Sequence, residues 1–126
     1  MKGKILIPAL LALGWLSHAW AEAEFDMDLM QTIEDLSKDL VSNLALADAA
    51  ASQADIAELD GLLAQVESHY AQKGDAQDAV DIAHNGRTLL LDIDKLVQAG
   101  DFDAANAKNS EFSRTCKTCH KAYKKS

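Results

Sequence analysis

Residues that interrupt helices are almost absent from the sequence. Its single proline is Pro8, and its only glycines after residue 21 are Gly61, Gly74, Gly86 and Gly100. That segment is rich in Ala, Leu, Asp, Glu, Gln and Lys, and most of these residues are good helix formers. No segment has the pattern of a β-hairpin, a solenoid repeat or a low-complexity linker. The sequence therefore predicts an all-α protein.

Basic residues are also scarce, since 12 Lys and Arg stand against 20 Asp and Glu, for a formal net charge of −8. A partner with a phosphate backbone requires a basic surface, so we expect no nucleic acid partner. The charge is uneven, because six of the basic residues but only one acidic residue, Glu111, lie in residues 108–126. Cations there stabilise the end of a helix, and they are also suited to docking a redox partner.

The N-terminus has the pattern of a secretory signal. Lys2 and Lys4 precede an apolar run over residues 5–16, and the small residues Ala19 and Ala21 follow it. A charged segment, an apolar segment and a small-residue cleavage site in this order are typical of a cleaved signal peptide. The sequence therefore predicts an exported protein.

This signal sets the predicted domain organisation. Cleavage is expected after Ala21, with Ala23 as the alternative, so residues 1–21 form the signal peptide and residues 22–126 form one mature domain. The apolar run is shorter than the roughly 20 residues of a membrane-spanning helix, and we expect no membrane insertion after cleavage. The predicted location is the bacterial periplasm.

Four segments of the mature chain carry apolar residues at helical spacing. We predict helices from about residue 26 to 50, from an N-cap at Ser52 to Gly74, from Asp75 to Gly100, and from Phe102 to the C-terminus. The apolar stripes of the first three are Leu29, Ile33, Leu36, Leu40, Leu44 and Ala47; Ile56, Leu59, Leu63, Val66 and Tyr70; and Ala79, Ile82, Gly86, Leu89, Leu90, Ile93, Leu96 and Val97. Because the connections are short, the predicted architecture is an up-down-up-down antiparallel four-helix bundle.

The candidate chemistry is concentrated in Cys116-Lys117-Thr118-Cys119-His120, which is the C-x-x-C-H pattern of c-type haem attachment. On a helix, positions i, i+3 and i+4 share a face. Two thiols can therefore add to the two vinyl groups of one haem while the adjacent histidine binds its iron. The pattern predicts one covalently bound haem c, with Cys116 and Cys119 as thioether links and His120 as the proximal iron ligand.

Two other uses of the cysteines are less compatible with the sequence. A redox-active C-x-x-C pair of the thioredoxin type needs a βαβ setting, which the sequence lacks. A structural zinc site needs four ligands, and Cys116, Cys119 and His120 form an incomplete set unless His69 or His84 joins them. The C-x-x-C-H motif, the predicted export and the helical context all favour haem attachment.

The segment Cys116-Lys117-Thr118-Cys119-His120-Lys121-Ala122-Tyr123-Lys124 lies at the C-terminal end of an exported four-helix chain, and in this it resembles the cytochrome c′ family and its low-spin, methionine-ligated relatives. The resemblance implies an antiparallel bundle with the haem between helices, His120 as the proximal ligand, and Lys124 close to the haem. A homodimer is compatible with it.

The distal iron ligand is sought in the first helix, because the resemblance places this helix on the distal side of the haem. With Ile33 at the centre of the stripe, Met30 lies about 60° and Met27 about 120° away at roughly 100° per residue. Met30 is therefore the candidate distal ligand, with Met27 and an open position as the alternatives. Methionine is also a common core filler, and His69 and His84 are expected to be solvated.

Two functions fit such a haem. The first is the transport of single electrons to and from redox partner proteins, with both axial positions of the iron filled. The alternative is a five-coordinate cytochrome c′ that binds a diatomic gas, nitric oxide or carbon monoxide, at an open distal site. A peroxide-consuming enzyme would need a distal acid–base residue that the sequence does not offer, so no enzymatic activity is expected. Phe102, Phe112 and Tyr123 are expected to pack in the core and against the haem.

Overall fold

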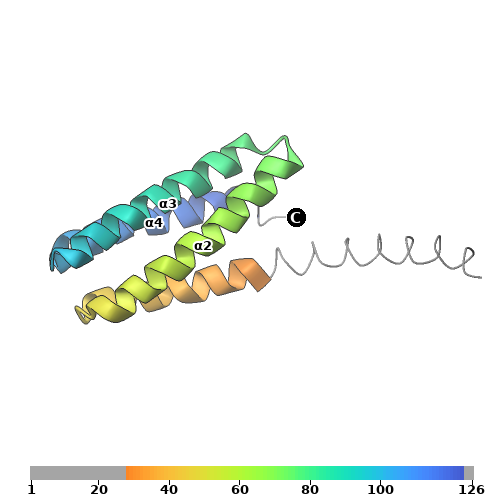
Figure 1. Cartoon of the computed structure of the whole chain (residues 1–126). Coiled ribbons are helices and arrows are strands. Elements are labelled where there is room, and N and C mark those ends of the chain that lie inside the picture. The colour runs from red at the N-terminus through yellow and green to blue at the C-terminus, as the bar shows by residue number, and fades with distance from the viewer. Residues whose placement is uncertain (1–27, 124–126) are drawn as a thin grey trace, which may run out of the picture. The chain divides into compact units, whose positions relative to one another are not determined.

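The structure of the protein is a computed structural model, which describes the backbone of residues 28–123 and the side chains of residues 28–119. The helices of this part are a helix over residues 28–45, α2 (Ala49–Lys73), α3 (Gln77–Gln98) and α4 (Phe102–Tyr123) (Figure 1). No strand occurs among the described residues. The predicted all-α class is confirmed, and four helices are consistent with a four-helix bundle. The signal peptide predicted over residues 1–21 lies outside the described residues.

The chain divides into two compact units, residues 1–32 and residues 33–126, which are described separately. The described part of the first unit is limited to residues 28–32, all of them helical. Within it Leu29 is buried and Met30 is half-buried. The second unit contains α2, α3 and α4, together with the helical residues 33–45.

The N-terminus of α2 corrects a sequence-based prediction. The cap is Asp48 instead of Ser52, and its carboxylate accepts a hydrogen bond from the Ala51 amide at 3.1 Å. The prediction was wrong because aspartate caps as well as serine does, and the earlier start turns Ser52 into the interior. Ala47, predicted on the apolar stripe of the first helix, lies in the preceding turn with φ 54°.

The buried residues of α2 and α3 repeat at a spacing of three and four. They are Ser52, Ile56, Leu59, Leu63, Val66 and Tyr70 in α2, and Ala79, Ala83, Gly86, Leu90, Ile93 and Val97 in α3. This spacing is the heptad pattern of helices that pack side by side, and α2 and α3 are in contact. Ile82, Leu89 and Leu96, predicted on the α3 stripe, are half-buried at the flank of this row.

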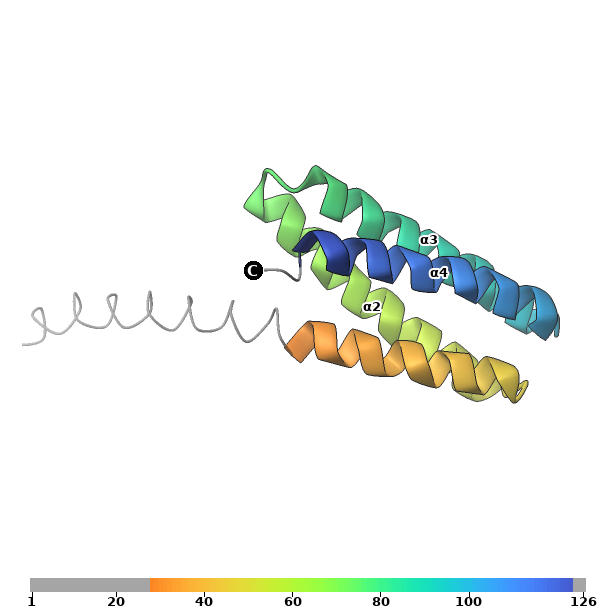
Figure 2. The same ribbon diagram turned by 180° about the vertical axis from the view of Figure 1, so that it is seen from behind.

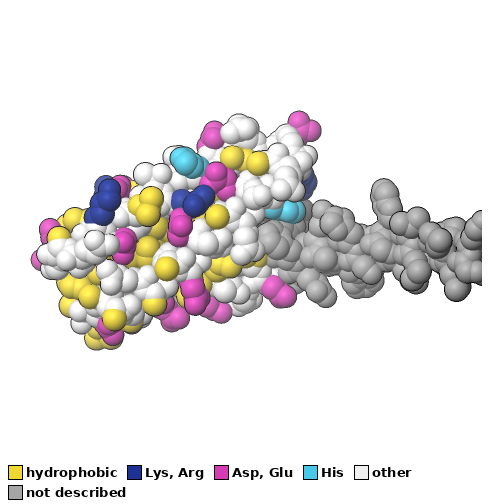
Figure 3. Space-filling model, in the orientation of Figure 1, with side chains coloured by type: hydrophobic (Ala, Val, Ile, Leu, Met, Phe, Trp, Pro, Cys, Tyr) yellow, Lys and Arg dark blue, Asp and Glu magenta, His cyan; other side chains and the backbone are white. Residues whose placement is uncertain are grey.

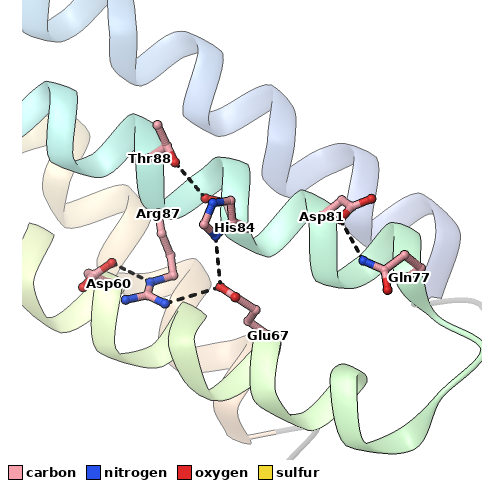
Figure 4. A network of polar contacts seen from close by, with 7 residues as sticks. All are labelled: Asp60, Glu67, Gln77, Asp81, His84, Arg87 and Thr88. Atoms are coloured by element: carbon pink, nitrogen blue, oxygen red, sulfur yellow. Dashed lines mark hydrogen bonds and ion pairs between the residues drawn. The ribbon is translucent and has the colours of Figure 1, made fainter.

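A polar cluster on the surface also joins α2 to α3 (Figure 4). Arg87 of α3 donates from Nε to Asp60 Oδ1 at 2.9 Å and from Nη1 to Glu67 Oε1 at 3.3 Å. The two carboxylates lie two turns apart on α2, so the guanidinium bridges them. The hydrogen bond to Asp60 is the largest influence on Arg87 and raises its pKa.

α3 and α4 are joined by a tight connection and lie side by side (Figure 2). Gly100 has φ 76°, a conformation that favours glycine, and Asp101 caps α4 by accepting from the Ala104 amide at 3.1 Å. A Cβ atom on Gly86 would lie 3.2 Å from Leu63 Cδ1 and 3.5 Å from Phe112 Cε1. Gly86 therefore marks a close approach of α3 to both α2 and α4.

Candidate haem attachment site

The whole C-x-x-C-H motif lies on α4, near the end of that helix. The backbone at Cys116, Cys119 and His120 is helical, so these residues have the shared face that the sequence predicts. The side chain of His120 lies outside the described residues, as do those of Lys121 and Tyr123. Of the three motif residues, the two cysteines are those whose side chains are described.

Cys116 continues the buried row of α4. Ala105, Asn109 and Phe112 are buried, and Cys116 follows Asn109 after two helical turns, within about 20° of the same direction. Cys116 and Cys119 are nevertheless only half-buried. The described residues thus cover the row as far as Phe112 and only partly at the two cysteines.

The surroundings of Cys116 keep its thiol protonated. Burial is the main cause, repulsion from the Cys119 thiolate when that group ionises adds to it, and together they raise the pKa of Cys116 to about 11. A hydrogen bond with the Ser37 hydroxyl acts in the opposite direction and lowers this pKa. The Ser37 hydroxyl also donates to the Ile33 carbonyl oxygen at 2.8 Å. Ser37 places the helical residues 33–45 beside α4 at the motif.

Cys119 faces a different neighbour. Burial raises its pKa, and the carboxylate of Asp78 in the first turn of α3 contributes to the same shift. Cys119 is turned by about 60° from Cys116 around α4, because three residues correspond to roughly 300°. The Cys116 thiol therefore lies toward residues 33–45, and the Cys119 thiol lies toward the start of α3. Together the two thiols span the inner face of α4.

Two thiols on one helix face can form two thioether bonds to one porphyrin, whereas a structural metal centre needs further ligands. Burial raises the pKa of both thiols, and the buried residues on the same face of α4 are Ala105, Asn109 and Phe112. Among residues with described side chains, no group of three His, Cys, Asp or Glu could hold a metal ion. His120 is not part of that set, so it stays a predicted ligand.

The remaining histidines have other neighbours. His84 is exposed as predicted, with Nδ1 3.7 Å from Glu67 Oε1 (Figure 4). His69 is half-buried instead of solvated, and the edge of its ring packs against Tyr70, with ring centroids 5.2 Å apart. Phe112 is buried as predicted, and Phe102 is half-buried.

Two residues beside the cysteines were not identified from the sequence. Ser37 and Asp78 approach Cys116 and Cys119 from other helices, and each contact depends on the relative register of two helices. The only sequence signal for Ser37 is its place one turn after Ile33 on the buried face of the first helix. Met27, the alternative distal ligand, lies outside the described residues.

Comparison of the chain with models of known families, with curated proteins and with solved structures finds no match. Within the described residues, no helix is both long enough and apolar enough to cross a membrane. A functional interpretation therefore depends on the residues of the site themselves.

Proposed function

We propose that this chain is a periplasmic cytochrome that carries single electrons through one covalently bound haem c. The observation that supports this most directly is the C-x-x-C-H motif on α4, with two half-buried, neutral thiols side by side on the inner face of the helix. A C-x-x-C-H sequence is a signature of c-type haem attachment. Haem iron supplies one-electron chemistry when it is bound.

Attachment needs only the two thiols and the two vinyl groups of the haem. At each cysteine the S–H would add across one vinyl double bond: a carbon–sulfur bond would replace the π bond, and the hydrogen would go to the second vinyl carbon. No oxidant is consumed.

The proposal extends to both axial positions. His120 would hold the iron on the α4 side, and Met30 is the candidate on the other side, as the resemblance to low-spin relatives of the cytochromes c′ implies. We further propose that the four helices run up-down-up-down, which would bring the first helix beside α4. A thioether ligand raises the reduction potential of haem iron, which suits a carrier. If both axial positions of the iron are filled, its ligands need to move little when the iron gains or loses an electron.

The test is expression of the whole chain in a bacterium with a haem c maturation system. We expect a periplasmic protein whose haem stays with the polypeptide in acid acetone and whose pyridine haemochrome corresponds to one haem per chain. Cys116→Ser and Cys119→Ser should each leave one vinyl group unsaturated and shift the haemochrome band to longer wavelength. The matched control is Thr118→Ser, between the cysteines, which keeps a hydroxyl to donate to the Arg114 carbonyl.

Two outcomes would count against the proposal. A wild-type protein that is exported but contains no covalent haem would remove the cytochrome interpretation. A haem protein that is high-spin in the ferric state and binds carbon monoxide readily would replace electron transport with the gas-binding alternative.

A further inference from the structure

The dipeptide Asn85-Gly86 lies in the middle of α3 and carries a chemistry that the proposed function does not use. The backbone nitrogen of the residue after an asparagine can attack the side-chain amide carbon, Cγ, and form a five-membered succinimide ring. A following glycine hinders this attack least, because it has no Cβ atom. Asn85 is the only asparagine of the sequence that precedes a glycine.

The side chain of Asn85 is also the least restrained of the asparagine side chains. The chain has four asparagines, and the structure describes the side chain of each. Asn43 and Asn106 each donate a hydrogen bond from Nδ2, at 2.7 and 2.9 Å, and Asn109 is buried. The Asn85 side chain is exposed and has no hydrogen-bond partner among the described residues.

Packing between the helices explains why a glycine follows Asn85. Gly86 is buried, and a Cβ atom there would lie 3.2 Å from Leu63 Cδ1 of α2 and 3.5 Å from Phe112 Cε1 of α4. A larger residue would push these side chains apart. The close approach of three helices therefore places a reactive Asn-Gly pair in the middle of a helix.

The helical backbone opposes the attack while α3 is closed. In an α-helix the Gly86 amide donates to the carbonyl oxygen four residues earlier, at Ile82. This hydrogen bond and the helical backbone angles must be given up before the Gly86 nitrogen can reach Cγ of Asn85. The reaction therefore needs α3 to open locally, and its rate depends on the fraction of time that this segment is open.

We propose that Asn85 is a modification site at which the opening of α3 is recorded as an isoaspartate. This inference does not depend on the proposed function, since it involves neither the cysteines nor a haem. In the open segment the Gly86 nitrogen forms a bond to Asn85 Cγ, the Cγ–Nδ2 bond breaks, and ammonia leaves with the Gly86 amide proton.

Water completes the reaction by opening the succinimide ring, and no oxidant or reductant takes part. If water breaks the bond between the Gly86 nitrogen and Cγ, residue 85 becomes an ordinary aspartate. If it breaks the bond between that nitrogen and the backbone carbonyl carbon, the chain continues through the side chain and residue 85 becomes an isoaspartate.

Both products weaken α3. Isoaspartate adds one methylene group to the backbone, which moves the following residues out of the helical repeat beside the close contacts of Gly86. Each product also adds a carboxylate four residues after Asp81, a spacing at which like charges repel. The chain already has a net charge of −8, and acidic side chains are spread over the face shown in Figure 3, where Lys and Arg are few. A chain that has reacted should therefore open more easily.

The first experiment measures isoaspartate at Asn85 by peptide mapping of the purified protein, incubated in mildly alkaline buffer with and without urea. We expect the reaction in buffer to be more than about a hundredfold slower than in urea, because α3 is open for only a small fraction of the time. Asn85→Gln is the control for the assignment and should abolish the product. Equal rates in buffer and in urea would overturn the proposal, as would a dominant product at another asparagine.

Two leucine substitutions test whether opening of α3 sets the rate. Leu63→Ala removes the side chain beside Gly86, so it should speed the reaction in buffer by about tenfold or more and leave the rate in urea unchanged. Leu91→Ala is the matched control, because this leucine of α3 is 55% exposed, and it should change the rate by less than about twofold. If Leu63→Ala does not fold, its rate in buffer should equal its rate in urea. A rate for Leu63→Ala equal to that of the wild type in buffer would overturn the role of opening.

The variant Asn85→Asp separates the effect of the added charge from that of the added methylene group. Its urea midpoint should lie only slightly below that of the wild type, since it keeps a normal backbone. The isoaspartyl protein, isolated by anion exchange through its added charge, should unfold at a clearly lower urea concentration than Asn85→Asp. An isoaspartyl protein as stable as the wild type would overturn the claim that the modification weakens α3.

Discussion

At the scale of single residues, the Cys116 thiol makes the sharpest prediction for the haem-free protein. Its pKa is raised to about 11, chiefly by burial, so little thiolate exists at pH 8, and the thiolate is the form that alkylates. We expect iodoacetamide to modify Cys116 roughly a hundredfold more slowly than an ordinary thiol of pKa about 8.5. The rate should rise about tenfold per pH unit up to about pH 10. Peptide mapping after timed alkylation measures it.

Ser37→Ala refines the same experiment. The Ser37 hydroxyl lowers the pKa of Cys116, so its removal should slow alkylation of Cys116 further. Protein unfolded in urea is the control, and there the wild type and the variant should react alike. A rate in the folded wild type that levels off near pH 8.5 would contradict the buried setting of this thiol.

Met30 carries a prediction for the haem-loaded protein. If its sulfur binds the iron, the ferric protein is low-spin and has a sulfur-to-iron charge-transfer band, which Met30→Leu abolishes. The same variant should lower the reduction potential, because the thioether ligand favours the ferrous state. Met27→Leu is the matched control and should keep the band. If Met27→Leu lost the band and Met30→Leu kept it, Met27 would be the distal ligand instead of Met30.

The residue scale also shows how far the sequence predicts the site. Cys116, Cys119 and His120 could be identified because their function depends on spacing within one helix, which the sequence contains directly. Ser37 and Asp78 could not, since their contacts require the register between helices. Ser52 was misassigned because Asp48 offers an equally good cap only four residues earlier.

At the scale of the helices, two glycines distinguish the effect of helix propensity on stability from the effect of side-chain packing. A Cβ atom on Gly61 of α2 would have no neighbouring atom within 4 Å, while one on Gly86 of α3 would lie 3.2 Å from Leu63 Cδ1. Alanine stabilises an exposed helix interior by about 1 kcal/mol relative to glycine. Gly61→Ala should therefore raise the free energy of unfolding by about that amount.

Gly86→Ala should gain less than Gly61→Ala, because the buried Leu63 and Phe112 side chains must move to admit the methyl group. Urea titrations of both variants measure the difference. The larger Gly86→Val substitution should destabilise the protein by about 1–3 kcal/mol. Equal stabilisation at both glycines would show that α2, α3 and α4 do not approach as closely as described.

The helices were more predictable than their ends. Apolar spacing located all four, because a helix that buries one face must repeat its apolar residues at that period. The ends depend on which of several neighbouring polar residues caps the backbone. The predicted stripe of α3 included Ile82 and omitted Ala83, whereas in the structure Ala83 is buried and Ile82 is half-buried.

At the scale of the second unit, α2 and α3 are expected to hold together without the proposed haem. Their heptad row is buried along its length, and Arg87 bridges Asp60 and Glu67 across the surface. The motif end of α4 differs, since Cys116 and Cys119 are only half-buried. Stability is therefore expected to be uneven, with the motif end the easier part to open.

Removal of both thioether links tests this unevenness. The variant Cys116→Ser/Cys119→Ser, isolated without haem, should keep most of its helical circular dichroism because the α2–α3 contact is unaffected. Its melting temperature should fall by on the order of 10 °C, since loss of about 2 kcal/mol shifts a domain of this size by that much. Hydrogen exchange should accelerate most at residues 113–119 and 33–37, while Leu59, Leu63 and Leu90 stay protected. The holoprotein Lys95→Gln is the control and should match the wild type. Uniform loss of protection over α2, α3 and α4 would show that the unit opens as a whole and that the α2–α3 pair has no stability of its own.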